Sequence, residues 1–325
     1  MYANVTPNPR TAEIDEGANN KDIDFIIALG GGSAIDTAKA IDVVYTNGGG
    51  SWDYTRGLGK LPKEIKNDLL PLIAIPTTAG TGSETTRYSV ITNSETHEKA
   101  TIKTDLIFPK KAIVDPELMF SVPRMTTALT GIDAFAHCFE SYIGSKANDF
   151  SDIFALKGIE LFAKSIITAC EDGSNDEARN NMALCSTLGG LSITHSATTL
   201  PHSIGQALSG VVDAPHGGSI AVCMSQIIRW TLPEAKEKMA KVACMFDSSL
   251  TSKTIDEQAN ALPEILENLF SKIIGQKLTM ADYGLTKDKV EAVADMALTN
   301  YNGDVSRHPR LANKQDLIEL INSCL

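Results

Sequence analysis

Two side chains that can bind a metal ion lie four residues apart in the segment 131–142. The apolar residues of this segment recur at helical spacing, and on a helix Asp133 and His137 share one face. This spacing alone also fits an ordinary helical pair of polar side chains. His202 and His216, each preceded by a proline, can supply further ligands. One carboxylate and three imidazoles form a mixed nitrogen and oxygen set that suits Fe(II) or Zn(II) rather than Mg²⁺ or Ca²⁺.

The other histidines serve as comparisons for this site. His195 lies in a stretch rich in serine and threonine, and we expect it to support the site or to belong to the core. His97 falls in a polar turn and is expected to be exposed. His308, which lies between an arginine and a proline, is expected on a surface loop. We therefore leave these three outside the predicted metal set.

A glycine turn follows the first strongly apolar run of the chain, which covers 23–29. Glycines occupy 30–32, and an amphipathic stretch follows over 34–45. This order predicts a strand, a turn and a helix, whose N-terminal N–H groups attract phosphate. Ser33 is expected to cap the helix, with Asp36 completing a capping box. A plain strand-to-helix connection without a ligand is the alternative.

A second apolar run, 69–76, leads into a loop that is rich in hydroxyl groups. Its side chains Thr77, Thr78, Thr81 and Ser83 can hydrogen-bond a pyrophosphate or an amide. If the two apolar runs form neighbouring parallel strands, both loops leave the sheet at its carboxyl edge, where open α/β sheets bind nucleotides. A polar surface loop without a ligand is the alternative here.

Two kinds of framework must position these loops and the metal-binding side chains. Up to Pro123 the chain alternates strand and helix patterns, and after it helical periodicity continues to the end. The further elements expected in the first part are a helix over 11–17, a hairpin of 88–92 and 99–103, and a strand over 111–116. We therefore predict an α/β domain over 1–123 and an all-helical domain over 124–325.

Composition argues against several classes of partner. The chain of 325 residues carries a net charge of −11 and no basic stripe, so nucleic acid and anionic membranes are poor partners. No apolar run is long enough to cross a bilayer, and no signal-peptide pattern opens the chain. The six cysteines are scattered without a Cys-x-x-Cys pair, which favours a reducing compartment. We expect a cytoplasmic protein with no nucleic-acid or membrane partner.

Taken in order, the motifs of this chain resemble those of the iron-dependent (group III) alcohol dehydrogenase family. The matching segments are Gly-Gly-Gly-Ser at 30–33 with Asp36 and Lys39, Pro-Thr-Thr-Ala-Gly-Thr-Gly-Ser-Glu at 76–84, Val-Asp-Pro at 114–116, Gly-Ile-Asp-Ala through histidine at 131–137, and Pro-His-Gly at 215–217. The resemblance covers nearly the whole chain. It implies a dehydroquinate synthase-like fold, with an incomplete Rossmann-like parallel sheet and an all-helical metal-binding domain on the two sides of a catalytic cleft.

The resemblance also implies an activity and its cofactors. It implies an oxidoreductase that transfers a hydride between NAD or NADP and a small primary alcohol or aldehyde. It implies Fe(II), or alternatively Zn(II), bound by Asp133, His137, His202 and His216. The cofactor contacts that it implies are Gly31, Gly32, Ser33, Asp36, Thr77, Thr78, Thr81, Ser83 and Lys99.

Two departures from the family pattern bear on activity. Family members carry a further strand–helix unit of about 60 residues before the Pro-Asn-Pro at 7–9, and this unit holds the acidic residue that grips the adenosine ribose. A histidine that many members use as a proton relay is here Gln206, which cannot titrate. The alternatives are a truncated, catalytically impaired homologue that still binds metal, and a zinc-dependent glycerol or polyol dehydrogenase. An uncovered sheet edge would also favour a homodimer or a larger homo-oligomer.

Overall fold

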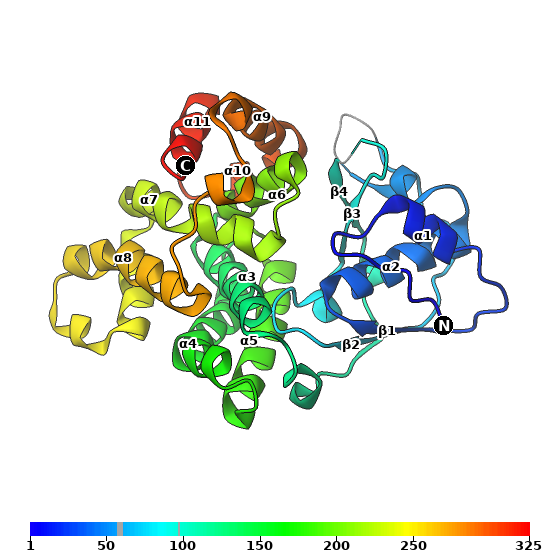
Figure 1. Ribbon diagram of the computed structural model, residues 1–325, viewed down its shortest axis with the longest axis horizontal. Helices are drawn as coiled ribbons and strands as arrows, with labels where there is room; N and C mark the ends of the chain where they lie inside the picture. Colours follow the sequence, from blue (N-terminus) through cyan, green and yellow to red (C-terminus); the bar gives the residue numbers. More distant parts are fainter. Residues whose placement is uncertain (57–60, 97) are drawn as a thin grey trace.

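The computed structural model describes residues 1–56, 61–96 and 98–325. It shows two lobes, an α/β lobe built from the N-terminal part of the chain and a helical lobe built from the rest (Figure 1). This arrangement agrees with the expected fold class. Among the described residues, no helix combines the length and the apolar character that crossing a membrane requires.

A three-stranded parallel sheet carries both predicted loops. Strand β1 (Ile26–Gly30) lies beside strand β2 (Leu72–Pro76), and the strand order is β1-β2-β5. The register pairs Ile26 with Leu72 and Gly30 with Pro76, so the two strands end at the same edge. The predicted adjacency of the two apolar runs is confirmed.

The third strand is shorter than expected. Strand β5 covers only Lys111–Ala112, whereas the sequence predicted a strand over 111–116. The carboxylate of Asp115 accepts a hydrogen bond from the backbone N–H of Glu117 at 3.0 Å and caps a 3-10 turn. Because the next residue is a proline with no N–H to donate, the chain leaves the sheet at this point.

Helix α2 (Gly32–Asn47) begins directly after the glycine turn. Gly31 is its N-cap residue and no side chain caps it, so the predicted capping box is wrong. The helix starts before Ser33, which places this serine inside the first turn. Asp36 instead accepts a hydrogen bond from the backbone N–H of Val90 at 2.8 Å.

The expected hairpin and the expected N-terminal helix are both confirmed. Strand β3 (Tyr88–Thr92) pairs antiparallel with strand β4 (Lys99–Lys103), and helix α1 (Thr11–Gly17) packs on α2. In Figure 1 the hairpin stands between α2 and the helical lobe. It therefore forms one wall of the space between the lobes.

One face of the parallel sheet remains uncovered in the described chain. Ala28 points toward α2 and is buried, but its neighbours on the strand, Ile27 and Leu29, are 54% and 60% exposed. Sheets of this type normally bury both faces under helices. This apolar face is compatible with the expected self-association, which stays a prediction.

The chain from Arg124 onward is helical wherever it is regular. Its α-helices are α3 (Arg124–Ile143), α4 (Asp149–Glu171), α5 (Asp176–His195), α6 (Leu200–Val212), α7 (His216–Phe246), α8 (Ile255–Ile274), α9 (Val290–Asn300), α10 (Asn302–Arg307) and α11 (Lys314–Asn322). Short 3-10 helices occupy Ser51–Tyr54, Ser83–Thr85, Asp105–Ile107, Pro116–Met119, Ser248–Ser252, Ala281–Tyr283 and Lys287–Lys289. The domain boundary predicted at 123/124 stays a prediction, and it coincides with the first residue of α3.

Helix α3 is the centre of the helical lobe. Its residues are buried on every side over the second half of its length, so it is a core helix rather than a surface helix. Phe135 lies against Phe139 and Phe162, with ring centroids 5.5 and 4.9 Å apart. Aromatic packing of this kind fixes the helix along its length. The polar residues of α3 are therefore held in a rigid frame.

Lys39 ties α2 to the hydroxyl-rich loop and to the hairpin. Its side chain is fully buried, which ammonium groups tolerate only with partners. The Nζ atom donates hydrogen bonds to the carbonyl oxygens of Ser83 at 2.7 Å, Thr86 at 3.0 Å and Tyr88 at 2.9 Å. Burial lowers the pKa of Lys39 to about 8. One ammonium thus joins α2 to a loop and a hairpin that follow it 44 to 49 positions later in the sequence.

Replacing Lys39 with methionine is expected to lower the free energy of unfolding by about 3 kcal/mol or more, because three buried carbonyl oxygens lose their donor. Urea denaturation followed by circular dichroism measures this change. Lys66→Met is the matched control, since it removes the same charge from a side chain that is 76% exposed. Equal losses in the two variants would show that the buried network does not stabilise the fold.

Candidate metal centre

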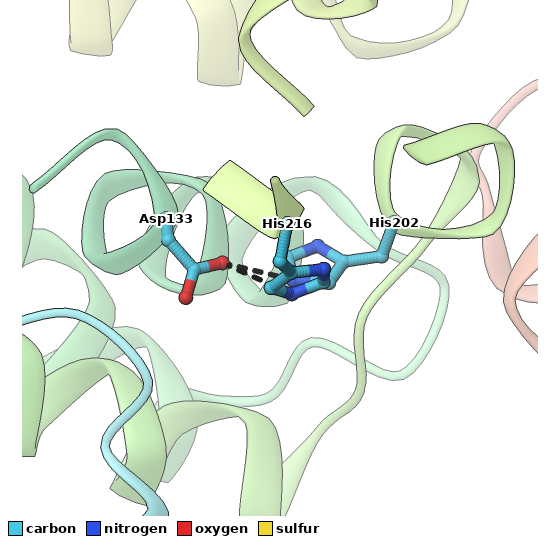
Figure 2. A group of neighbouring side chains, drawn as sticks. All are labelled: Asp133, His202 and His216. Carbon is cyan, nitrogen blue, oxygen red and sulfur yellow. Dashed lines mark ion pairs between the residues drawn. The ribbon is translucent and has the colours of Figure 1, made fainter. Parts of the chain in front are cut away.

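Three of the four predicted metal ligands, Asp133, His202 and His216, converge on one point of the helical lobe, and the fourth, His137, lies beside them. The Oδ1 atom of Asp133 lies 3.4 Å from Nε2 of His202, 3.5 Å from Nε2 of His216 and 3.8 Å from Nε2 of His137. Figure 2 shows Asp133 and the rings of His202 and His216 directed toward one another. These three offer ligand atoms that all lie within 4.8 Å of one another. This spacing is short enough for one cation to contact all of them.

Each side chain reaches this point for a local reason. On α3 the four-residue spacing stacks Asp133 and His137. Helices α6 and α7 both begin at the site, because Pro201 occupies the first turn of α6 and Pro215 is the N-cap residue of α7. The prolines explain why His202 and His216 each lie at a helix start.

A glycine allows α7 to approach α3 closely. A Cβ atom added at Gly217 would lie 2.1 Å from the carbonyl oxygen of Leu129, which no side chain could tolerate. The start of α7 therefore rests directly on the backbone of α3. This contact sets the distance between His216 and Asp133.

The polar atoms of the cluster fit a bound cation. In the described part of the chain, Oδ1 of Asp133 and Nε2 of His202 are buried and have no hydrogen-bond partner. Unpaired buried polar atoms are strongly unfavourable unless something satisfies them. A carboxylate oxygen with imidazole nitrogens is a donor set that suits Fe(II) or Zn(II).

Three of the four side chains are in the protonation state that binds a metal. Burial raises the pKa of Asp133, but the three histidines outweigh burial and hold it below its usual value, so the carboxylate stays ionised. Burial lowers the pKa of His137, and it lowers that of His216 to about 3, so both rings are neutral near pH 7. Neutral imidazoles and an ionised carboxylate are the forms that bind metals.

Glu140 is part of the site, although the sequence analysis did not single it out. It is fully buried, and its Oε1 lies 2.5 Å from Nδ1 of His202. Its Oε2 accepts hydrogen bonds from the backbone N–H of Thr199 at 2.6 Å and from the hydroxyl of Thr199 at 3.2 Å. The sequence contained a signal for this role, because residue 140 lies one helical turn after His137 and therefore on the same helix face.

The carboxylate of Glu140 orients His202. By accepting a hydrogen bond from Nδ1–H, it fixes the ring with Nε2 directed at the cluster. Burial lowers the pKa of His202, but Glu140 and Asp133 outweigh it and raise the pKa to about 10. A cation that binds at Nε2 must therefore displace a proton from this ring.

A single cavity joins this cluster to the glycine turn. It has a volume of about 410 Å³, and its walls include all four predicted metal ligands. Of the nine predicted cofactor residues, six line it: Gly32, Ser33, Asp36, Thr81, Ser83 and Lys99. The other three, Gly31, Thr77 and Thr78, are not part of its lining. The cavity is therefore large enough, and suitably placed, for a ligand that spans both ends.

The glycine turn and the hydroxyl-rich loop touch each other at this cavity. A Cβ atom at Gly32 would lie 2.4 Å from Cγ2 of Thr81, and one at Gly31 would lie 3.0 Å from Oγ1 of Thr78. Gly30 has a φ of 148°, which favours glycine. The two loops thus form one surface at the N-terminus of α2, where phosphate is favoured.

Several of the predicted cofactor residues are already engaged by protein groups. Asp36 accepts a hydrogen bond from the hydroxyl of Ser83 at 2.6 Å. The ammonium of Lys99 donates hydrogen bonds to the side chains of Asn8 and Ser209. These side chains are fixed in place before any ligand arrives.

Gln206 lies on α6 one turn after His202 and lines the same cavity. It is 8% exposed, and its Oε1 has no hydrogen-bond partner among the described residues. An amide in this position can hydrogen-bond a ligand but cannot take up a proton.

Two of the predictions for the other histidines are wrong. His195 is exposed at the end of α5, and its ring packs against Phe150 with centroids 4.7 Å apart. His308 is 1% exposed, with Nε2 lying 2.7 Å from the hydroxyl of Thr231 on α7. The segment after α10 folds back on α7, which buries His308. The prediction for His97 lies outside the described residues.

Comparison with known proteins identifies the family. Residues 127–325 match the profile of the Fe-containing alcohol dehydrogenase family, C-terminal, and residues 1–116 match that of iron-containing alcohol dehydrogenase. The chain belongs to the iron-containing alcohol dehydrogenase family. It is therefore a metal-dependent oxidoreductase that acts on alcohols and aldehydes with a nicotinamide cofactor, as the resemblance implied.

Individual members of this family match over nearly the whole chain. It is 34% identical to the 1,3-propanediol dehydrogenase of Klebsiella pneumoniae, over 98% of this chain and 81% of that protein. It is 32% identical to the NAD-dependent methanol dehydrogenase of Bacillus methanolicus, over 100% of this chain and 84% of that protein. A crystal structure of 1,3-propanediol oxidoreductase superposes with a TM-score of 0.92, at 32% identity over 99% of this chain and 83% of that one.

Replacing Glu140 with alanine is expected to weaken metal binding about 10- to 100-fold, because the orientation of His202 is lost. Titration of the metal-free protein with zinc, followed by calorimetry, measures this affinity. Glu140→Gln keeps an acceptor for the Nδ1 proton and should lose less. Glu177→Ala, at a carboxylate that is 70% exposed, is the control. If Glu140→Ala binds zinc as wild type does, Glu140 has no part in orienting the ligand.

Proposed function

We propose that this chain is an NAD-dependent dehydrogenase that interconverts a small primary alcohol and its aldehyde, with Fe(II) held by Asp133, His137, His202 and His216. The observation that carries the proposal is the convergence of these side chains, with unpaired Oδ1 and Nε2 atoms, on a cavity that also reaches the glycine turn. Metal-dependent hydride transfer needs a metal-binding cluster and a phosphate-binding turn in the same cavity.

The metal end of the cavity prepares the alcohol oxygen. When bound, the cation supplies Lewis acidity, which lowers the pKa of an alcohol hydroxyl. The ionised carboxylate of Asp133 would balance part of the charge of the cation, and the rings of His137 and His216, which are neutral near pH 7, would supply nitrogen ligands. Glu140 holds the ring of His202 through its Nδ1 atom, so that Nε2 also faces the cluster. The side chains are positioned beforehand, so little reorganisation is required when substrate arrives.

The other end of the cavity positions the cofactor. The N-terminus of α2 offers backbone N–H groups and partial positive charge to a pyrophosphate. Gly32 lets phosphate approach the backbone, and Thr81 adds a hydroxyl beside it. When bound here, a nicotinamide ring would supply the hydride acceptor for the carbinol carbon. The task of the two loops is to hold that ring within reach of the substrate and to keep water out.

Gln206 limits the routes by which the proton of the alcohol can leave the site. It lies on the cavity wall beside the cluster, and its amide can donate to and accept from a substrate hydroxyl. It cannot accept a proton itself. Proton release must therefore pass through water or a ribose hydroxyl rather than through this side chain.

Three finer points belong to the proposal. NAD is favoured over NADP because the name of the relative from Bacillus methanolicus specifies NAD. Fe(II) is favoured over the zinc-dependent polyol alternative because the matched family profiles are those of iron-containing enzymes. A homodimer or larger homo-oligomer and a cytoplasmic location stay predictions from the sequence.

Replacing Asp133 with alanine is expected to remove bound metal and to lower kcat/KM by about 10³-fold, or about 4 kcal/mol, because the only anionic ligand is lost. Metal content after anaerobic loading with Fe(II) and steady-state oxidation of a primary alcohol give the two readouts. Asp68→Ala, at an exposed position, is the control. Full metal content and activity in Asp133→Ala would exclude the proposed centre.

Replacing Gly32 with alanine is expected to raise the Kd for NADH at least about tenfold, because the new Cβ and the displaced Thr81 obstruct the phosphate surface. Fluorescence titration with NADH measures this constant, and metal content should not change. Gly50→Ala serves as the control, since its Cβ would meet other atoms only at 3.5 Å or beyond. Unchanged NADH affinity in Gly32→Ala would place the cofactor elsewhere.

A further inference from the structure

A group of positive charges lies on the wall of the same cavity. It consists of Arg56, Lys103 and Arg307, and we call it the outer cationic group. Arg56 is exposed and the other two are partly exposed, whereas Asp133 at the metal cluster is 2% exposed. The group therefore lies toward solvent. Such a concentration of positive charge is unexpected in a chain with a net charge of −11.

Strand β4 positions two members of the group. Lys99, Thr101 and Lys103 alternate along the strand, and all three line the cavity. The backbone N–H of Arg56 donates to the carbonyl oxygen of Thr101 at 2.9 Å, which brings Arg56 beside this row. The Nζ atom of Lys103 lies 5.2 Å above the ring centre of Tyr88 on the neighbouring strand. The α/β lobe thus directs two cations into the cleft.

The helical lobe supplies the third cation from the opposite wall. Arg307 is the last residue of α10, and it lines the cavity together with Lys99 and Lys103 of the hairpin. Its guanidinium lies 3.2 Å from Oδ1 of Asp304. The outer cationic group therefore lies on the wall of the same cavity as the metal cluster.

The protein balances the positive charges of the group only in part. Among the described residues, Arg307 pairs with Asp304, whereas neither Arg56 nor Lys103 forms an ion pair with a carboxylate. Burial lowers the pKa of Lys103, and the charges of Arg307, Arg87 and Arg56 lower it further, whereas the charge of Asp304 raises it. Like charges held together without an anion repel one another, and a bound anion would relieve this repulsion.

Apolar side chains also line this cavity. Val90, Ile193 and Ala197 belong to its wall, together with Tyr88. They can contact a short hydrocarbon stem, while a guanidinium fork and an ammonium contact oxyanion oxygens. One cavity wall thus offers metal-binding, apolar and cationic groups.

We propose that the cleft takes alcohols or aldehydes that carry a terminal oxyanion, with the reacting carbon at the metal cluster and the anionic group on Arg56, Lys103 and Arg307. This substrate class rests on the proposed dehydrogenase function. The rival occupant of the cationic group is a phosphate of the nicotinamide cofactor. The two occupants predict different effects of replacing Lys103. The KM for the aldehyde changes if the substrate binds there, and the KM for NADH changes if a cofactor phosphate does.

The test compares two four-carbon aldehydes, succinic semialdehyde with a terminal carboxylate and neutral butyraldehyde, in the NADH-dependent reduction by the metal-loaded enzyme. Wild type is expected to prefer the anionic aldehyde in kcat/KM. Lys103→Gln should raise the KM for succinic semialdehyde about tenfold, while the KM values for butyraldehyde and NADH stay unchanged. Lys103→Arg keeps the charge and should restore most of the loss.

Lys157→Gln is the matched control, since it removes the same charge from a side chain on α4 that is 49% exposed. Added salt should raise the KM for succinic semialdehyde and not that for butyraldehyde. Equal kcat/KM values for the two aldehydes in wild type would overturn the proposal. So would a Lys103→Gln variant whose KM rises for NADH instead of the aldehyde.

The experiment distinguishes failure of the proposed dehydrogenase function from failure of the proposed substrate class. If the metal-loaded enzyme reduces neither aldehyde, the dehydrogenase assignment of the site fails. The anion site is then judged by calorimetric titration of the metal-loaded protein with succinate. Binding that Lys103→Gln weakens and Lys157→Gln does not would support the site, and the absence of such a difference would overturn it.

Discussion

A carboxylate buried among three imidazoles is the constraint on which the helical lobe depends. Asp133 is 2% exposed, and in the described chain no hydrogen-bond donor reaches its Oδ1. Such an atom is tolerated only where a cation can satisfy it. The packing of the lobe serves this requirement, because α3 is enclosed on all sides and both α6 and α7 begin at the carboxylate. Two helix N-termini also bring partial positive charge, which favours the ionised form.

The second wall of the cleft is held by a different interaction. Lys39 fastens the end of the hydroxyl-rich loop and the start of the hairpin to α2, so the phosphate surface and the hairpin are held together. Hydride transfer requires two carbon atoms to be brought together with little freedom, and rigid walls on both sides provide this. The local charge of this cleft, rather than the negative charge of the whole chain, decides which small molecules it attracts.

The sequence by itself determined the features that depend on local order. Helical spacing places Asp133 and His137 on one face, and alternation over 88–92 and 99–103 predicts the hairpin with its observed ends. Each proline before a histidine indicates a helix start, which is why His202 and His216 were recognisable. The parallel strands followed from two apolar runs that each end in a loop. In all of these, the residues that decide the structure are neighbours in the chain.

Only the tertiary structure decided which distant side chains meet. Glu140 reaches His202 across 62 positions, and His308 is buried on α7 whereas His195 is exposed. Lys103 shares a cavity with cations that come from segments far from it in the sequence. The absence of the predicted capping box on α2 also results from tertiary contacts, because the hairpin hydrogen-bonds the side chain of Asp36. An amphipathic pattern specifies which face of an element is buried but not what lies against that face, because packing partners are chosen by the shape and charge of the whole fold.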